Sequence, residues 1–246
     1  MSITPLEGRV TLVTGAGRRV GRAVALRLAR EGVRVAVHYH RSRAEAEAVS
    51  SEIAAAGGES LCVQADLARP AEIETLFSAI EARFGRLDIL VNNAALFYPT
   101  PLAETTEEQW DRLLDSNLKS QFFCAQRAAA LLRASGQGRI VNFASDGGLL
   151  AWPRYMAYSV SKAGVIMLTR TLARALAPEI TVNAIAPGTI SFPGDAPEIA
   201  EDFIRKAPLK RTGTADDISE AVMYFIRAPF VTGQVLAVDG GRSIPT

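Results

Sequence analysis

The sequence contains little of what would define several specialised classes of protein. Its 246 residues include only two cysteines, Cys62 and Cys124, and both stand among apolar neighbours. Two such thiols are typical of core packing, so we expect neither a disulfide framework nor a metal site. No apolar run reaches the roughly 18 residues that a membrane helix needs, and the first residues lack a signal-peptide pattern. We therefore expect a soluble cytoplasmic protein that has no membrane partner.

An excess of charge of one sign is also missing. The 27 basic and 26 acidic side chains leave a formal charge of +1. Proteins that bind nucleic acid normally carry a clustered basic excess, so this balance argues against a nucleic-acid partner. The hydrophobic fraction of 48% and the charged fraction of 22% exclude a disordered chain. A folded chain of this mass buries about 70% of its extended surface, which is enough for one large core.

What the sequence does contain is a regular alternation of short β-branched runs and longer helical segments. Strands that are apolar throughout, such as residues 10–13, are expected where both faces of a sheet are covered. The alternation predicts one α/β domain over residues 1–246, built as a doubly wound parallel sheet of about seven strands with helices on both faces. The predicted strands cover residues 9–14, 33–39, 60–65, 87–92, 139–144, 180–186 and 234–238, and the predicted helices cover 19–31, 43–56, 70–84, 106–133, 154–177 and 214–227.

One stretch departs from the alternation. Residues 189–208 are rich in proline and acidic residues and follow the sixth predicted strand. Ligands enter such sheets at the carboxyl ends of their strands. The pattern therefore predicts an irregular, mobile substrate loop over 189–208.

A glycine-rich turn, TGAGRRVG at residues 14–21, connects the first predicted strand to a helix. Glycines allow the backbone to turn sharply and approach a pyrophosphate, and the helix N-terminus supplies free N–H groups. The spacing is not G-x-G-x-x-G, because Val20 stands where the last glycine would be and Gly21 follows it. The turn alone is also compatible with a simple strand-to-helix connection, but its place after the first strand of a doubly wound sheet favours nucleotide binding.

The end of the second predicted strand, HYHRS at 38–42, has no carboxylate where one would bind the ribose 2′-hydroxyl of NAD. Arg41 and Ser42 can instead neutralise and hydrogen-bond a 2′-phosphate, with Arg18 on the other side of the adenosine. This pattern favours NADP(H), and the alternative is a solvated basic loop. Asp66, after the third predicted strand, either accepts from the adenine amino group or caps the next helix.

The sharpest chemical signal is Tyr158, which is followed four residues later by Lys162 within a predicted helix. This spacing places the phenol and the ammonium on one helical face, where the cation can stabilise a phenolate. Moving the tyrosine pKa from about 10 toward neutrality takes about 4 kcal/mol, which we expect from the lysine together with an oxidised nicotinamide. Such a tyrosine can give or take the proton that accompanies hydride transfer. Ser145, thirteen residues upstream, is placed to hold a substrate carbonyl oxygen, although an isolated Tyr-x-x-x-Lys pair is more often an ordinary surface pair.

Together these features resemble the short-chain dehydrogenase/reductase family over essentially the whole chain. The resemblance implies an oxidoreductase with a Rossmann-type domain that moves hydride between a nicotinamide cofactor and a CH–OH or C=O group. It is carried, in order and spacing, by the glycine turn, Asp66, Asn92, Asn93, Ala94, Ala95, Asn117, Ser145, Tyr158, Lys162, Pro187 and Gly188.

The resemblance also implies a role for individual residues. Tyr158 is the expected general acid, Lys162 binds the nicotinamide ribose and lowers the tyrosine pKa, and Ser145 orients the carbonyl. Asn117 helps to hold a proton-relay water. The expected cofactor-binding residues are Gly15, Gly17, Arg18, Arg19, Val20, Gly21, His40, Arg41, Ser42, Asp66, Leu67, Asn93, Ala94, Ala95, Tyr158, Lys162, Pro187, Gly188 and Ile190.

A narrower resemblance links the chain to the pteridine reductases within that family. Arg19 replaces a glycine of the turn as in those enzymes, and Phe97 matches the phenylalanine that stacks on the pterin ring. The substrate would then lie against Phe97, Ser145 and Tyr158. Two features depart from the branch: Ser145, followed by Asp146, matches its acidic partner of the tyrosine, and Ala95 matches a cofactor-side serine. A serine does not titrate near neutral pH and is typical of a carbonyl reductase instead, and Phe97 is equally compatible with ordinary loop packing.

These observations lead to three hypotheses. The main one is an NADPH-dependent, pteridine-reductase-like enzyme that acts on a small carbonyl or pterin-like substrate. The second is a 3-oxoacyl-carrier-protein reductase, and the third is a non-catalytic NADP-binding redox sensor, against which the complete Ser145, Tyr158 and Lys162 set argues. The long segments 106–133 and 154–177 carry broad Ala and Leu faces, and in this family such helices pair across two-fold axes. The resemblance therefore implies a homotetramer, with a homodimer as the alternative.

Overall fold

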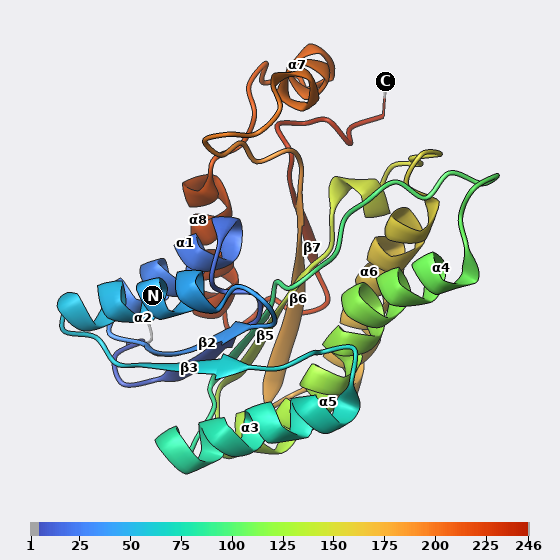
Figure 1. Cartoon of the computed structure of the whole chain (residues 1–246). Helices are drawn as coiled ribbons and strands as arrows, with labels where there is room; N and C mark the ends of the chain where they lie inside the picture. Colours follow the sequence, from blue (N-terminus) through green and yellow to red (C-terminus); the bar gives the residue numbers. More distant parts are fainter. Residues whose placement is uncertain (1–4, 246) are drawn as a thin grey trace.

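The computed structural model describes residues 5–245, and its centre is one sheet of seven parallel strands (Figure 1). The strand order is β3-β2-β1-β4-β5-β6-β7, so the chain starts in the middle, builds outward to β3 and then crosses back to β4. This arrangement confirms the predicted doubly wound fold. The strands are β1 (Val10–Val13), β2 (Arg34–Tyr39), β3 (Ser60–Gln64), β4 (Ile89–Asn92), β5 (Gly138–Phe143), β6 (Ile180–Pro187) and β7 (Val235–Val238).

Helices cover both faces of this sheet (Figure 1). One face carries α1 (Arg19–Arg30), α2 (Arg43–Ala55) and α8 (Ala215–Arg227). The other carries α3 (Pro70–Phe84), α5 (Ser120–Ala134) and α6 (Met156–Leu176). Within residues 5–245, no helix combines the length and the apolarity that crossing a membrane would require.

Local sequence signals explain where several helices begin and end. Pro70 occupies the first turn of α3, where its missing N–H costs nothing, and Gly85 ends that helix in the left-handed conformation at φ +69°. Thr106 and Thr214 each accept from the backbone N–H of the third helical residue, so both form capping boxes. Thr214 thereby sets the start of α8 one residue inside the predicted range.

The predicted helix over 106–133 is interrupted in the structure. It consists of α4 (Glu107–Leu114), a π-helical segment η1 (Asp115–Lys119) and then α5. A π-helical segment inserts one residue into the turn and shifts the faces of the flanking helices. Periodicity alone did not indicate this insertion, because the sequence on both sides is helix-forming.

The prediction of an irregular stretch over 189–208 was wrong in its second half. Residues Pro197–Lys206 form α7, which lies apart from the sheet layers beside the C-terminal segment (Figure 1). The helix has Pro197 and Glu198 in its first turn and Arg205 and Lys206 in its last, as the helix dipole favours. Phe203 anchors it, because its ring is 3% exposed.

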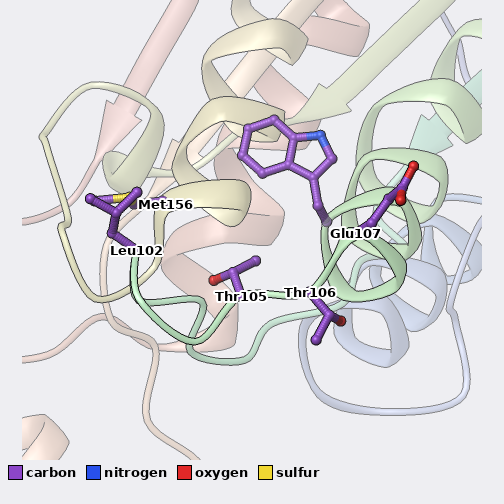
Figure 2. Close-up of a pocket in the computed structure, with 6 residues that line it drawn as sticks. Leu102, Thr105, Thr106, Glu107 and Met156 are labelled. Atoms are coloured by element: carbon purple, nitrogen blue, oxygen red, sulfur yellow. The ribbon is translucent and has the colours of Figure 1, made fainter.

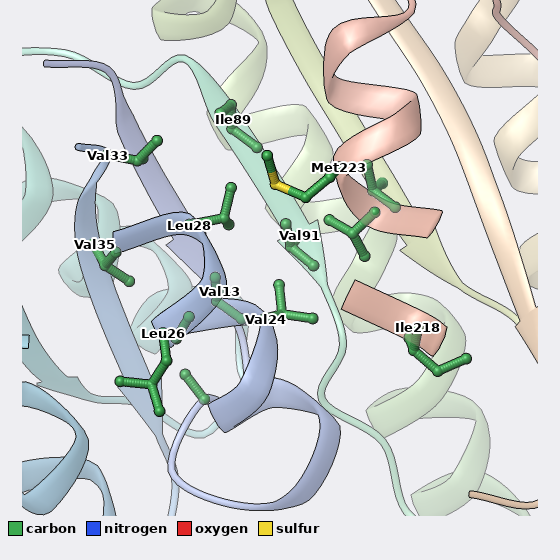
Figure 3. Packing of buried hydrophobic residues seen from close by; sticks show 14 of the residues in the cluster. Val13, Val24, Leu26, Leu28, Val33, Val35, Ile89, Val91, Ile218 and Met223 are labelled. Atoms are coloured by element: carbon green, nitrogen blue, oxygen red, sulfur yellow. The ribbon is translucent and has the colours of Figure 1, made fainter. Parts of the chain in front are cut away.

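The core consists of two main apolar clusters, one on each face of the sheet. Figure 3 shows the cluster between the sheet and helices α1 and α8, where Val13, Val35 and Val91 meet Leu28 and Met223. The opposite cluster joins alternate residues of the same strands to α3, α5 and α6. Because both faces are buried, the central strands are apolar throughout, which explains why the sequence located them well.

Candidate functional site

The carboxyl ends of β1 and β4 lie side by side, because these two strands pair where the chain reverses its direction of building. The glycine turn follows β1 there and packs tightly on the segment after β4. A Cβ atom on Gly15 would lie 3.1 Å from Ala94 Cα, and a Cβ atom on Gly21 would lie 2.2 Å from Gly15 O and 2.6 Å from Asn93 Nδ2. Only glycine fits at Gly21, because any side chain there would collide with the backbone of the turn and with Asn93.

Hydrogen bonds fix the segment after β4 to this turn. Thr14 Oγ1 accepts from the backbone N–H groups of Asn93 and Ala94, each at 2.9 Å. The Asn93 side chain donates to Thr14 O at 2.8 Å and to Gly15 O at 3.2 Å. Asn93 and Ala94 are therefore held to the glycine turn by four hydrogen bonds.

The residues predicted to bind a 2′-phosphate lie beside the turn. A Cβ atom on Gly17 would lie 3.1 Å from Ser42 Oγ, so the glycine turn and Ser42, the N-cap of α2, are in contact. Arg18 and Arg41 are both exposed, and neither forms a salt bridge within residues 5–245. Two guanidinium groups without a salt-bridge partner in the described part of the chain, together with a hydroxyl beside a glycine-rich turn, fit a phosphorylated dinucleotide.

Arg19 has a different environment from the other residues of the turn. Its backbone has φ +51°, a conformation that favours glycine, and its side chain reaches the segment after β6. The guanidinium donates to both carboxylate oxygens of Asp195, at 2.6 and 3.0 Å, and lies 4.3 Å from the centre of the Phe192 ring. It also approaches Ile190 O at 3.5 Å.

His38 supports the turn from beneath and was not among the predicted site residues. Its Nδ1 accepts from the Gly15 N–H at 3.0 Å, and its Nε2 lies 3.0 Å from Ala65 O. A carbonyl oxygen can only accept, so the proton is on Nε2 and the ring is neutral. Burial lowers the pKa of His38 to about 4. In the sequence, the signal for this role was a polar residue near the end of the predicted buried strand that became β2.

Asp66 adopts a local turn and does not cap the next helix directly. Its Oδ1 accepts from Ala68 N–H at 3.1 Å, and its own N–H donates to the Glu72 side chain at 2.6 Å. The N-cap of α3 is Arg69. The alternative that Asp66 caps the next helix is therefore wrong, because α3 begins at Pro70 and its N-cap lies three residues after Asp66. Leu67, the next predicted cofactor residue, is buried beneath this turn.

The three predicted catalytic residues converge between β5 and α6. Ser145 follows β5 and is the N-cap of η2 (Asp146–Gly148), a short 3-10 helix pressed against α6. Lys162 is fully enclosed and donates from Nζ to Phe143 O at 2.7 Å, and its ammonium lies 5.7 Å from the centre of the Tyr158 ring. The spacing of four therefore places the cation beside the phenol, as expected.

The protein's own groups do not make Tyr158 acidic, and the predicted contribution of an oxidised nicotinamide stays a prediction. Burial raises the pKa of Tyr158 to about 12, the hydrogen bond with Ser145 lowers it, and the charge of Asp146 raises it further. Burial also lowers the pKa of Lys162 to about 7. The phenol is thus protonated at neutral pH, which suits a group that donates a proton.

Asn117 lies in the π-helical segment η1, and its side chain is fully buried. It donates to Leu96 O at 2.9 Å and to Ser161 Oγ at 3.2 Å, and it accepts from Leu96 N–H at 2.7 Å. Ser161 in turn donates to Tyr158 O at 2.7 Å. Asn117 therefore ties the segment after β4 to the catalytic helix, and the π insertion is what turns it toward α6.

An aromatic cluster surrounds the Tyr158 ring. Phe97 stacks on Tyr155 with ring centres 4.7 Å apart, and it meets the edges of Tyr158 at 4.8 Å and Trp152 at 6.5 Å. Trp152 is nearly parallel to Tyr158 at 6.3 Å. Phe97 is 54% exposed, so it is not a core residue, and its free surface is available to a ligand.

Thr100 fixes the segment that carries Phe97 to the start of α6. The side chain is fully buried, and its Oγ1 accepts from Ala157 N–H at 3.1 Å. Beyond it lies an apolar pocket of about 270 Å³ (Figure 2). Leu102, Trp110 and Met156 line the pocket together with Thr105, Thr106 and Glu107.

The remaining predicted cofactor residues occupy the same edge of the sheet. Pro187 ends β6, and a Cβ atom on Gly188 would lie 2.7 Å from the Phe203 ring. Ile190 is buried and bridges to Gly213. The structure therefore brings the predicted residues of the segments that follow β1, β2, β3, β4, β5 and β6 to one edge of the sheet, and these include Val20, His40 and Ala95.

Comparisons with known proteins agree with this architecture. A family model described as enoyl-(acyl carrier protein) reductase matches residues 15–243. A 3-oxoacyl-(acyl-carrier-protein) reductase from Synechocystis is 39% identical over 243 residues, which cover 97% of this chain and 98% of the relative. The chain therefore belongs to the short-chain dehydrogenase/reductase family of oxidoreductases, which confirms the resemblance seen in its sequence.

Further relatives and solved structures give the same result. The 3-oxoacyl-(acyl-carrier-protein) reductase FabG of Staphylococcus aureus is 42% identical over 236 residues, which cover 94% of this chain and 96% of that enzyme. A crystal structure from Sinorhizobium meliloti, described as a short-chain alcohol dehydrogenase, superposes with a TM-score of 0.91 at 33% identity and covers 98% of both chains.

The neutral His38 predicts a specific loss of stability in acid. Its pKa is about 4 in the folded chain and 6.5 ordinarily. As the pH falls from 6.5 to 4, the unfolded chain binds a proton that the folded chain does not, so the free energy of unfolding decreases. The contribution lost between pH 7 and 4.5 is about 2 to 3 kcal/mol.

Urea unfolding at the two pH values measures this loss. His38→Gln keeps one acceptor and one donor but does not titrate, so the variant should lose about 2 to 3 kcal/mol less than the parent chain over the same interval. Equal losses in the two proteins would show that His38 is protonated in the folded state or does not carry the contacts described.

Proposed function

We propose that the protein is an NADPH-dependent reductase that transfers hydride to a carbonyl carbon. The observation that carries the proposal is the convergence of Ser145, Tyr158 and Lys162 beside the glycine turn. A non-catalytic NADP-binding protein would need the turn but not a buried phenol held between a serine hydroxyl and an ammonium.

The chain's own residues supply the proton and the orientation. Ser145 donates a hydrogen bond to the substrate oxygen and orients it, and Tyr158, protonated at neutral pH, gives that oxygen its proton as negative charge develops. Lys162 holds positive charge beside the phenol, which lowers the cost of the phenolate that forms. When bound, the reduced nicotinamide supplies the hydride.

The substrate class that the comparisons favour is a 3-oxoacyl thioester. The Synechocystis and Staphylococcus relatives are named as 3-oxoacyl-(acyl-carrier-protein) reductases, and they match nearly the full chain. A serine in place of an acidic residue beside Tyr158 suits a ketone, because reduction of a ketone needs one proton at oxygen and no second acid. The apolar pocket at Leu102 and Met156 offers room for an alkyl chain next to the site.

A flat pterin-like ring is the second candidate. The exposed face of Phe97, with Tyr155 and Trp152 around Tyr158, favours a planar substrate that can stack. The two candidates differ in what they need from the site, because a thioester requires an apolar channel whereas a pterin requires aromatic contact.

Steady-state assays test the function. With NADPH we expect turnover of an acetoacetyl thioester, and Tyr158→Phe should reduce kcat by a factor of about 10² to 10⁴ while leaving the fold intact. Tyr224→Phe, an exposed tyrosine on α8, is the matched control and should retain the parent rate. Turnover of dihydrobiopterin alone would favour the second candidate, and turnover of neither substrate would contradict the proposal.

The proposed preference for NADP(H) depends on Arg41. Its guanidinium is free to pair with a 2′-phosphate, so Arg41→Glu should weaken NADP+ binding by a factor of about 10 to 100 and leave NAD+ binding unchanged or stronger. Calorimetry measures both affinities. Arg43→Glu is the control, because Arg43 already pairs with Glu47 in α2. Equal effects on the two dinucleotides would argue against this role for Arg41.

We also propose that the protein forms a homotetramer, with a homodimer as the alternative. Phe122 on α5, Val160 and Met167 on α6, and Trp110 on α4 all leave much of their apolar surface exposed in the single chain. Association would cover these side chains. Sedimentation equilibrium at micromolar concentration should give about four times 26.3 kDa. A monomer would contradict both assemblies.

A further inference from the structure

Beside the catalytic serine lies an acidic residue that the mechanism above does not use. Asp146 follows Ser145 directly and is 2% exposed. Its Oδ1 accepts from the Ser145 hydroxyl at 3.1 Å, and its Oδ2 has no hydrogen-bond partner among the described residues. Buried carboxylate oxygens are normally hydrogen-bonded, so an unpartnered one next to the reacting site calls for an explanation.

The environment of Asp146 includes charges from three other elements. Arg242 of the C-terminal segment approaches Oδ2 with its Nε at 3.6 Å, Asp239 lies at the end of β7, and Tyr158 lies on α6. Lys162 is also on α6, but its ammonium donates to Phe143 O. Burial, the largest influence, raises the pKa of Asp146 to about 6; Ser145 and Arg242 lower it, and Asp239 raises it. The carboxyl group therefore changes its charge near pH 6.

The packing of η2 holds Asp146 in place. A Cβ atom on Gly147 would lie 2.8 Å from the Trp152 ring, and one on Gly148 would lie 2.7 Å from the Lys162 backbone. The loop therefore sits directly on the catalytic helix with no room to shift. Its N-cap bond, from Gly147 N–H to Ser145 Oγ at 3.1 Å, fixes one lone pair of the catalytic hydroxyl.

The Ser145 hydroxyl has one proton and two lone pairs, and Gly147 occupies one of the lone pairs. An ionised Asp146 can only accept, so it takes the Ser145 proton, and the serine then has none to offer a carbonyl oxygen. Tyr158 is the other hydrogen-bond partner of this hydroxyl, and in the reaction it turns its proton toward the substrate oxygen. A protonated Asp146 can then donate to the remaining lone pair, and the Ser145 proton becomes free to point toward the substrate. A single proton on Asp146 thus reverses the direction of the hydrogen bond.

We propose that Asp146 is a positioning residue for the reduction: its protonation state decides whether the Ser145 hydroxyl donates to Asp146 or to the substrate oxygen. The inference rests on the proposed carbonyl reduction. Ionised Asp146 has a second unfavourable effect, since its negative charge opposes the phenolate that forms on Tyr158. Protonated Asp146 removes both obstacles at once.

The pH profile of reduction tests this role. In the parent enzyme, kcat/KM for an acetoacetyl thioester should fall as the pH rises through about 6, because the protonated form of Asp146 disappears there. The fall should be about 10-fold to 100-fold, the range set by the loss of a hydrogen bond involving a charged group. Asp146→Asn should remove this fall, because an amide facing Arg242 with its oxygen presents N–H to Ser145 at every pH.

Further variants separate positioning from a merely structural role. In Ser145→Ala the fall should shrink to the part that the charge of Asp146 exerts directly on Tyr158, because the larger part acts through the serine. Arg242→Gln should move the fall to higher pH, and Asp239→Asn should move it to lower pH, because these charges shift the pKa of Asp146 in opposite directions. Persistence of the fall in Asp146→Asn, or a fall in Ser145→Ala as large as in the parent enzyme, would overturn the proposal.

An infrared titration of the full chain keeps the test independent of turnover. A protonated-carboxyl band that is absent in Asp146→Asn should appear as the pH is lowered through about 6 and should change frequency in Ser145→Ala. If neither substrate is reduced, the proposed function fails, whereas this titration still reports on the hydrogen bond. Absence of the band, or a band that ignores Ser145, would overturn the inference even in an active enzyme.

Discussion

The hydrogen bond from Lys162 Nζ to Phe143 O joins the two elements on which the site depends. It connects the catalytic helix α6 to the last residue of β5, and Ser145 follows that strand two residues later. The ammonium is fully buried, and this carbonyl is its partner among the described residues. Because an unpartnered buried cation is costly, the bond constrains how α6 docks on the sheet, and with it the distance between Tyr158 and Ser145.

Burial shifts the pKa values of the acids and of the bases at this edge of the sheet in opposite directions. Burial raises the pKa values of Tyr158 and Asp146 and lowers those of Lys162 and His38. In each case the neutral form gains, as expected where water is replaced by a less polar environment. Burial therefore leaves Tyr158 protonated as a donor and keeps His38 a neutral support for the glycine turn, whereas Lys162, with a pKa of about 7, keeps its positive charge below that pH.

The sequence was sufficient to predict the sheet, because strands that both helix layers cover are mostly apolar. It also identified Tyr158 and Lys162, because a spacing of four residues within a predicted helix places a phenol beside an ammonium. It did not predict α7, since prolines and acidic residues obscured a helix held by Phe203, or the π insertion at Asn117. The roles of His38 and Asp146 depend on contacts between distant segments, which local pattern does not encode.

At each end of the segment over residues 189–208, an arginine from another part of the chain lies over an aromatic ring of the segment. At its start, Arg19 of the glycine turn lies over the Phe192 ring and pairs with Asp195. At its end, Arg242 lies over the Phe203 ring and faces Asp146. Each arginine bridges an aromatic ring of this segment and a carboxylate, one on the cofactor side and one on the catalytic side. The segment therefore holds two charged side chains of the site by its aromatic rings, Arg19 in the glycine turn and Arg242 next to the catalytic serine's neighbour Asp146.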